Sequence, residues 1–400
     1  MAREATDAVT LPAEGGRRIQ EVDALRGFAL GGILVVNALV IAGVPAVPGD
    51  TADLVAKGLV TAFVETKFYL LFSFLFGYSF TLQQESAERA GARFVPRMLR
   101  RLLGLFVLGL LHFVLLYTGD ILTMYAVLGL ILLAARGASA GRLWTAARWV
   151  HAATSALLLA AAALLTLLTG DGADGAPDTS AQTARLTEAY RGAPADVIAA
   201  HLSAWSEVVG AFLFAGGLIT AALLAGAAAG RRRLLAGETL GTDRLRRIGV
   251  YGVVCGLPGS LLMAAGATGV LPYRWETLTF VVGMVTAPAL TAAYGSALLL
   301  WMRTPRGAAT RRLLAPAGRM ALTGYLTQSL VLALVFTGYG LALYGRVGAV
   351  AVLGGALVLY AGQLLLSAWL MRRHRLGPVE WLLRAVTLAG HPDQGRRTRS

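Results

Sequence analysis

The sequence predicts an all-α, polytopic membrane protein, a single bundle of about ten transmembrane helices with both termini in the cytoplasm. Of its 400 residues, 56% are apolar and only 14% are charged, and the mean hydropathy is +0.64. Soluble domains carry about a quarter charged residues, so most of this chain must face lipid or other membrane helices. Its basic residues form short clusters between long apolar runs, which is typical of membrane topology and excludes a nucleic-acid-binding protein.

Ten apolar runs are long enough to cross the hydrocarbon core of a bilayer as helices. They centre on residues 25–46, 67–83, 102–118, 119–135, 150–169, 204–229, 248–269, 278–302, 320–340 and 347–371. The third and fourth runs could also form one long tilted helix. Because Gly119 followed by Asp120 is a turn signal, we favour a hairpin of two helices.

The positive residues predict the orientation of the bundle. Ten spans with both termini inside place 30 of the 36 Lys and Arg residues on the cytoplasmic side. The six on the outer side are Lys57, Lys67, Arg185, Arg191, Arg274 and Arg346. Residues 1–20 then form a cytoplasmic tail, residues 21–388 one transmembrane domain with an outer polar loop at about 170–196, and residues 389–400 a basic cytoplasmic tail.

Two kinds of site are excluded by residue counts and spacing. Cys255 is the only cysteine, so an intrachain disulfide and a cysteine-based metal site cannot form. We expect no metal, because no histidine has a second histidine or a carboxylate at ligand spacing on one face of a span. The glycines Gly170, Gly172 and Gly175 match a dinucleotide-binding pattern. They follow a membrane helix in an acidic loop, and not a strand, so they do not indicate a dinucleotide site.

The first span carries a polar cluster of Asp23, Arg26 and Asn37. Asp23 and Arg26 are three residues apart, so they can pair on one face of the helix at the cytoplasmic boundary. Asn37 lies deeper in the same helix and needs a hydrogen-bond partner on another helix. The cluster predicts either a substrate-binding group or, equally, a helix cap with an ordinary cytoplasmic charge.

His112 is the only histidine well inside a span. An ionisable side chain at membrane depth is costly and usually faces the interior of the bundle, which makes His112 a candidate general base. Asp120 and Tyr125 follow at the outer turn. We expect His112 to face an internal polar cavity with Asp120 at its outer end; the alternative is a packing histidine bonded to a neighbouring carbonyl.

Four other segments carry polar or helix-breaking residues. Glu65 and Lys67 precede an aromatic run and are read as a surface pair in preference to a substrate site. Gln328 and Ser329 place hydrogen-bonding groups inside the membrane. Glu380 and Arg384 can pair on a helix that begins at Pro378 and lies on the inner leaflet. The stretch Gly256-Leu257-Pro258-Gly259, with Pro288 in the next span, predicts broken helices.

Taken together, these stretches resemble the YeiB family of bacterial membrane proteins, whose C-terminal part, here about residues 240–388, is a domain of unknown function numbered 418. The matching positions are Asp23, Arg26, Gly27, Asn37, Leu75-Phe76-Gly77, His112, Gly119-Asp120-Ile121-Leu122, Tyr125, residues 318–329, Gly377-Pro378-Val379-Glu380-Trp381 and Arg384. The first span is also similar to membrane acyltransferases of the heparan glucosaminide acetyltransferase type. Those enzymes use a histidine just beyond the first span; residues 40–67 contain none, so either His112 supplies the base or the chemistry is lost.

The resemblance implies an acyltransferase of the bacterial cytoplasmic membrane. Acyl-CoA would enter from the basic inner face, and His112 with Asp120 would activate an acceptor from the outer side. Donor binding is assigned to Arg97, Arg100 and Arg101, and substrate binding to Asp23, Arg26, Asn37, Tyr125 and Gln328. The alternative is a secondary transporter of a small solute; a scaffold or sensor is a third hypothesis. The expected partners are the lipid bilayer and an unidentified small molecule, and the sequence leaves a homo-oligomer open.

Overall fold

The computed structural model describes residues 19–45, 49–169, 180–237 and 239–388, and this part of the chain is helical without a β-strand. Its helices are α1 (Gln20–Ile41), α2 (Thr51–Phe63), α3 (Lys67–Arg89), α4 (Phe94–Leu115), α5 (Leu122–Ala134), α6 (Ala140–Thr169), α7 (Ser180–Arg191), α8 (Pro194–Ser203), α9 (Trp205–Arg231), α10 (Thr242–Ala267), α11 (Glu276–Met302), α12 (Gly307–Arg319), α13 (Ala321–Phe336), α14 (Ala349–Arg373) and α15 (Pro378–Leu388), with short 3₁₀ helices η1 (Ala135–Gly137) and η2 (Tyr273–Trp275). The glycine pattern at residues 170–175, the C-terminal tail and most of the N-terminal tail lie outside the described residues.

The polytopic helical bundle is confirmed. In the described part of the chain, eight helical units are long and apolar enough to cross a membrane, counting α2 and α3 as one unit. All ten predicted runs are helical, but α5 has only 13 residues, a rise of about 20 Å. The run near residue 320 belongs to a broken pair, α12 and α13, bent by 78°. The count of ten crossings and the cytoplasmic side of both termini stay predictions.

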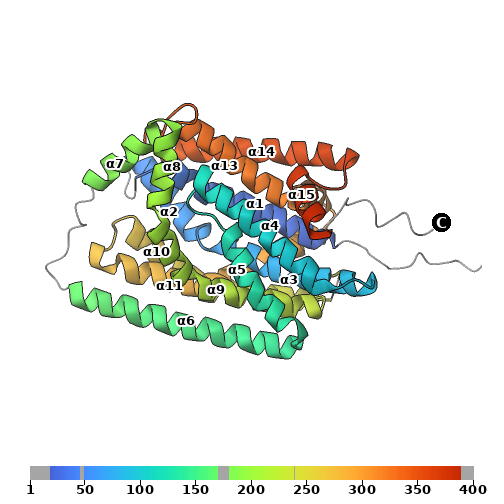
Figure 1. Ribbon diagram of the computed structural model, residues 1–400. Helices are drawn as coiled ribbons and strands as arrows, with labels where there is room; N and C mark the ends of the chain where they lie inside the picture. Colours follow the sequence, from blue (N-terminus) through green and yellow to red (C-terminus); the bar gives the residue numbers. More distant parts are fainter. Residues whose placement is uncertain (1–18, 46–48, 170–179, 238, 389–400) are drawn as a thin grey trace, which may run out of the picture.

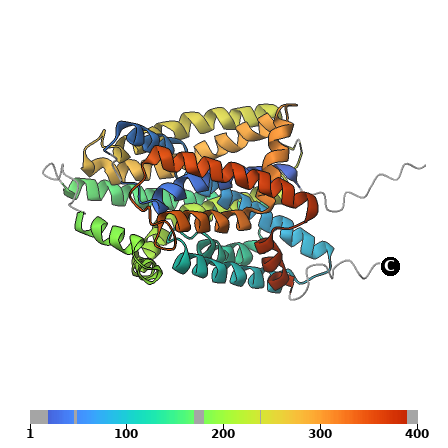
Figure 2. The ribbon, with the colours of Figure 1, turned by 90° about the horizontal axis from the view of Figure 1, so that it is seen from above.

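The long helices lie side by side along one axis of the molecule (Figure 1, Figure 2). Helices α2, α7 and α8 gather at one end, and α15 lies at the opposite end beside the start of α1 (Figure 1). Backbone hydrogen bonds tie distant loops together at the first end, for example from Gly338 N–H to Tyr190 O at 2.8 Å. Following the predicted orientation, we name the end with α2, α7 and α8 the outer end and the end with α15 the inner end.

The turn at Gly119-Asp120 separates α4 from α5, so the predicted hairpin is confirmed. The Asp120 carboxylate accepts the backbone N–H groups of Leu122 at 3.2 Å and Thr123 at 2.7 Å, which have no partner within α5. Gly109 lets α4 approach this turn, because a β-carbon at Gly109 would lie 2.6 Å from Asp120 Oδ2. Local sequence therefore fixes Asp120 against α4.

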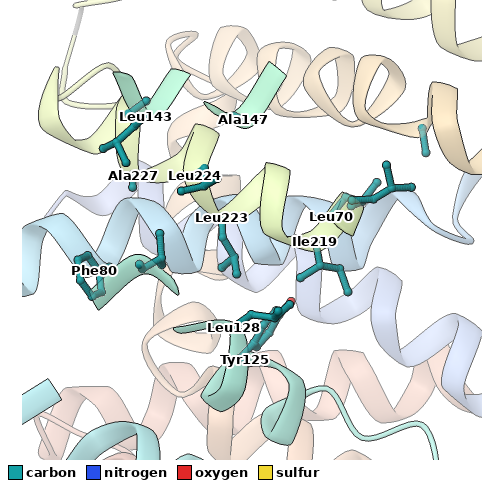
Figure 3. Packing of buried hydrophobic residues seen from close by; sticks show 14 of the residues in the cluster. Leu70, Phe80, Tyr125, Leu128, Leu143, Ala147, Ile219, Leu223, Leu224 and Ala227 are labelled. Atoms are coloured by element: carbon teal, nitrogen blue, oxygen red, sulfur yellow. The ribbon is translucent and has the colours of Figure 1, made fainter. Parts of the chain in front are cut away.

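A core of buried apolar side chains holds α5 in place against three long helices. It contains Leu70 and Phe80 of α3, Tyr125 and Leu128 of α5, Leu143 and Ala147 of α6, and Ile219, Leu223, Leu224 and Ala227 of α9 (Figure 3). In a bilayer such packing depends on close contact more than on the hydrophobic effect. The core thus anchors the short helix that carries Asp120 at its start.

Two predictions are wrong: the helix breaks at Pro258 and Pro288, and the position of Lys67 at the surface. Helices α10 and α11 run without a break through Pro258 and Pro288, since proline is tolerated in membrane helices when neighbouring groups satisfy the freed backbone. Lys67 is not at the surface: its side chain is fully buried, and its Nζ donates to Thr61 O at 3.0 Å. The helix α2, which the sequence did not predict, covers this position.

Candidate functional site

His112 lies in the last turn of α4 and is completely enclosed, with 0% of its side chain exposed. Its Nε2 is 2.8 Å from the hydroxyl oxygen of Ser329 on α13. Its Nδ1 is 3.0 Å from Asp120 Oδ1. That carboxylate oxygen lies off the direction of the Nδ1–H bond, so the contact is electrostatic and not an aligned hydrogen bond. The imidazole of His112 thus lies between the hydroxyl group of Ser329 and the carboxylate of Asp120, which is a Ser–His–Asp arrangement.

Aromatic rings close the space around the imidazole. The Tyr325 ring lies against it, with ring centroids 4.8 Å apart, and the Tyr117 ring meets it edge-on at 6.2 Å. The Tyr325 hydroxyl donates a long hydrogen bond of 3.4 Å to Gly119 O. Because Tyr325 and Ser329 are four residues apart on α13, they occupy the same face of that helix.

His201 is a second buried histidine near the site, at the end of α8. His201 is 1% exposed, and its Nδ1 is 3.0 Å from Val114 O. Burial lowers the pKa of His201 below its usual value, so the neutral form is favoured beside His112. Sequence analysis missed this residue, because nothing in the segment 194–203 indicated that it folds back onto α4.

A cavity of about 1200 Å³ runs from the inner end toward His112. Near its mouth it is bordered by Ile19, Glu21, Arg89, Arg97, Arg233, Arg311 and Leu388, and deeper in by Leu30, Ile33, Phe72, Phe76, Leu105, Ile121, Leu122, Tyr125 and Tyr325. His112, Asp120 and Ser329 do not line it. The expectation that His112 faces the cavity is therefore wrong in this conformation: Tyr325 stands between them.

The mouth of the cavity carries more cations than anions. Among the described residues that border it, Arg89, Arg97, Arg101 and Arg384 form no ion pair within 4 Å of a carboxylate. Other arginines there are paired, as in Arg311 with Glu21 at 3.3 Å and Arg233 with Glu85 at 2.6 Å. Arg100 was expected to belong with Arg97 and Arg101, but it lies outside the cavity lining and donates to Thr387 O at 3.2 Å.

The polar cluster of the first span is only partly assembled at the cavity. Arg26 pairs with Asp23 at 3.1 Å and also donates to the Ser79 hydroxyl, and both charged residues border the cavity. Asn37 is half-buried, and its side chain has no hydrogen-bond partner among the described residues. The expected bond from Asn37 to another helix is therefore not formed.

Tyr125 and Gln328, the other predicted substrate-binding residues, lie in different surroundings. Tyr125 borders the cavity, with its hydroxyl 2.9 Å from Ser73 Oγ. Gln328 is buried on another side of α13, where its Nε2 donates to Gln363 Oε1 of α14 at 2.7 Å. Gln328 is not among the residues that border the cavity.

Glu380 holds the start of α13. Its Oε1 accepts the backbone N–H groups of Leu322 at 2.8 Å and Thr323 at 3.0 Å, and its Oε2 accepts the Thr323 hydroxyl. The predicted pair with Arg384 is thus replaced, since the free N–H groups and the dipole of a helix N-terminus attract a carboxylate. Helix α15 packs on the bundle through buried Leu383 in addition to any contact with lipid.

Comparison with known proteins identifies the family. The family model for a protein of unknown function (DUF418) matches residues 229–390. The "Uncharacterized protein YxaH" of Bacillus subtilis (strain 168) is 30% identical over 414 residues, covering 97% of this chain and 98% of that protein. The "Uncharacterized 39.9 kDa protein in amylase 3'region" of Bacillus acidopullulyticus is 28% identical over 92% of this chain and 94% of its own.

The "Uncharacterized protein YeiB" of Escherichia coli (strain K12) is 34% identical over 146 residues, 32% of this chain and 36% of that protein. No solved structure matches the chain.

Within the described residues, no group of three His, Cys, Asp or Glu side chains is placed to hold a metal ion. The match to YxaH spans nearly the full length of both proteins, and the described part of the chain has eight helical units long and apolar enough to cross a membrane. The chain therefore belongs to the YeiB-like DUF418 family and is a multi-pass membrane protein.

Proposed function

We propose that this protein is an acyltransferase of the bacterial cytoplasmic membrane, which passes an acyl group from a cytoplasmic acyl-CoA thioester to an acceptor at the outer side. One observation carries the proposal: a single face of α4 connects the cation-rich mouth of the cavity with His112. Arg97, Arg101 and Leu105 follow one another along this face at four-residue intervals and border the cavity. His112 lies 15 residues beyond Arg97, about 22 Å along the helix.

The donor would lie along this face with its phosphates at the mouth. Arg97, Arg101 and Arg384 border the cavity and form no ion pair with an acidic side chain among the described residues, and guanidinium groups bind phosphates through charge-assisted hydrogen bonds. The deeper walls, formed by Leu30, Ile33 and neighbouring aromatic rings, suit an acyl chain. In this arrangement the thioester end approaches Tyr325, the last residue before the imidazole.

The chemistry would depend on His112 and Asp120. The two backbone N–H groups of α5 hold the Asp120 carboxylate in place beside the imidazole, where it can orient the ring. His112 can then act as a general base. Asp23, Arg26 and Tyr125 border the cavity and can contact the donor. We assign no part in the donor site to Asn37, Arg100 or Gln328, because they lie outside the cavity lining.

Transport of a small solute is the competing function. The broken helices that suggested it in α10 and α11 are not present. The remaining break, between α12 and α13, presents a helix N-terminus, but Glu380 already occupies two of its N–H groups. The structure therefore offers a solute less free backbone than the sequence had indicated.

The deciding experiment uses the purified full chain in lipid nanodiscs, acetyl-CoA labelled in the acetyl group, and a crude bacterial envelope extract as the source of acceptor. We expect the label to move from CoA to an envelope component. If the label stays on CoA while proteoliposomes containing the protein accumulate an intact solute, the acyltransferase proposal is refuted and transport takes its place. Heat-inactivated protein gives the background for both measurements.

A further inference from the structure

We propose that Ser329 is the nucleophile of this site and holds the acyl group as an ester between donor and acceptor. The inference rests on the proposed acyltransferase function and makes that function a two-step, covalent transfer. The serine was not among the catalytic residues that the sequence predicted, because it meets His112 across 217 positions of the chain.

The two contacts of His112 indicate which proton its imidazole can accept: that of the Ser329 hydroxyl. We place the proton of the neutral ring on Nδ1, the nitrogen that lies 3.0 Å from the Asp120 carboxylate, and this tautomer leaves Nε2 as the acceptor. The group on Nε2 is the Ser329 hydroxyl at 2.8 Å. An outside acceptor could reach Nε2 only by displacing Ser329, so the geometry activates the serine first.

The hydroxyl of Ser329 also behaves differently from other hydroxyls in the same helix. Buried serines and threonines in helices usually donate to the carbonyl one turn earlier. Thr337, buried directly after the end of α13, does so to Ala333 O at 2.8 Å, and the exposed Thr327 of α13 does so to Thr323 O at 2.9 Å. The Ser329 side chain is 1% exposed, and among the described residues His112 is its single hydrogen-bond partner. A serine held only by an imidazole is the arrangement that activates a nucleophile.

Access to Ser329 requires movement of one side chain. Tyr325 lies one turn before Ser329 on the same face of α13, covers the imidazole and borders the cavity. Its hydroxyl donates the long bond of 3.4 Å to Gly119 O. Rotation of this ring would join the deep end of the cavity to Ser329 while leaving the contact between His112 and Asp120 intact.

The transfer balances without any oxidant or further reactant. In the first step, Ser329 Oγ attacks the thioester carbonyl and gives its proton to His112 Nε2. The C–S bond then breaks, and the CoA sulfur leaves as a thiol with that proton. In the second step, an acceptor hydroxyl gives its proton to His112 and attacks the ester. The ester C–O bond breaks, and Ser329 takes the proton back.

The test is carried out on the full chain in nanodiscs with two reagents. A long-chain alkyl fluorophosphonate should form one adduct, which peptide mass spectrometry locates on Ser329. Labelled acetyl-CoA without acceptor should leave an acetyl ester on the same residue after acid quenching. His112→Ala should slow fluorophosphonate labelling by roughly 100-fold or more, since the base is lost. Ser260→Ala is the matched control, because Ser260 is equally buried on α10 but has no histidine partner.

Ser329→Cys separates a chemical role from a structural one. The variant should retain part of the transfer and form an acetyl thioester that neutral hydroxylamine cleaves, which the serine ester resists. Transfer at the wild-type rate by Ser329→Ala would overturn the covalent step while leaving the proposed acyltransferase function standing. Absence of both adducts from Ser329 of the wild-type chain would also overturn it. A fluorophosphonate adduct without release of label from CoA would instead refute the acyl-CoA donor.

Discussion

Two clusters of ionisable side chains are buried toward the outer end of the bundle, and they differ in the origin of their partners. Around Lys67 the side-chain bonds are local: its Nζ donates to Thr61 O at 3.0 Å, and the Thr61 hydroxyl donates to Glu65 at 3.0 Å. Only the Lys67 backbone carbonyl has a distant partner among the described residues, the Thr291 hydroxyl of α11 at 3.0 Å. Around His112 the partners come from eight and 217 positions away. The side chains of the first cluster join the consecutive helices α2 and α3, whereas those of the second come from α4, α13 and the turn before α5.

The two clusters also differ in their relation to empty space. Thr66, between Glu65 and Lys67, has a positive φ of 71°, so the Lys67 cluster sits at a strained turn from α2 into α3. Neither Lys67 nor Glu65 borders the cavity, but Tyr325, which covers His112, does. The comparison teaches that burial of a charge alone does not mark a reactive site. We propose that the His112 cluster, next to a cavity and with partners on several helices, is the reactive one.

The largest expected effect comes from removal of the base. His112→Ala should lower acyl transfer by roughly 100-fold or more, because proton transfer in both steps depends on the imidazole. His151→Ala on α6 is the matched control and should retain the wild-type rate. The rates are measured by label transfer from acetyl-CoA, with size-exclusion profiles to compare folding. A misfolded His112→Ala variant, or a fully active one, would make His112 a packing residue like Lys67.

An intermediate effect is expected at the mouth of the cavity. The double variant Arg97→Ala/Arg101→Ala should raise KM for acyl-CoA by roughly 10- to 100-fold with little change in kcat, since it removes charge-assisted hydrogen bonds to the phosphates. Arg100→Ala should change KM less than twofold, because its guanidinium faces α15. If the double variant and Arg100→Ala changed KM equally, these charges would serve to orient α4 in the membrane and not to bind the donor.

The smallest effect on activity is expected at the Lys67 cluster. Lys67→Met keeps the volume of the side chain but leaves the Thr61 carbonyl and Glu65 without their cation, at a cost of about 1–3 kcal/mol in stability. The midpoint of thermal unfolding in detergent should fall, while acyl transfer stays within twofold of wild type. A variant of unchanged stability that loses transfer would show that the two clusters share one function.

The sequence could predict those residues of the site that are marked by their depth in a membrane span or by their spacing along one helix. His112 stands out because an imidazole within an apolar span is costly, and Asp120 because it occupies the turn that follows. Arg97 and Arg101 share a face by their four-residue spacing. Arg100 has the same charge, but its neighbouring position turns it toward α15, a helix whose docking the sequence did not predict.

The remainder of the site depends on contacts between distant segments. Ser329 meets His112 only once α13 packs on α4, and no local pattern distinguishes it from Gln328 beside it. Glu380 was expected to bind Arg384 on its own helix, yet it binds the N-terminus of α13, 57 residues before it. Helix breaks were expected at prolines, but the chain bends at Met320, between α12 and α13.

The walls of the cavity come from opposite ends of the described chain, Ile19 to Arg26 on one side and Leu376 to Leu388 on another. During synthesis α1 enters the membrane first, long before α15 has left the ribosome. A nascent chain that stops before Glu380 lacks both a wall of the cavity and the carboxylate that holds the start of α13. If the proposed function holds, a donor can bind only after α15 has been made, so partial translation products would carry an unfinished site.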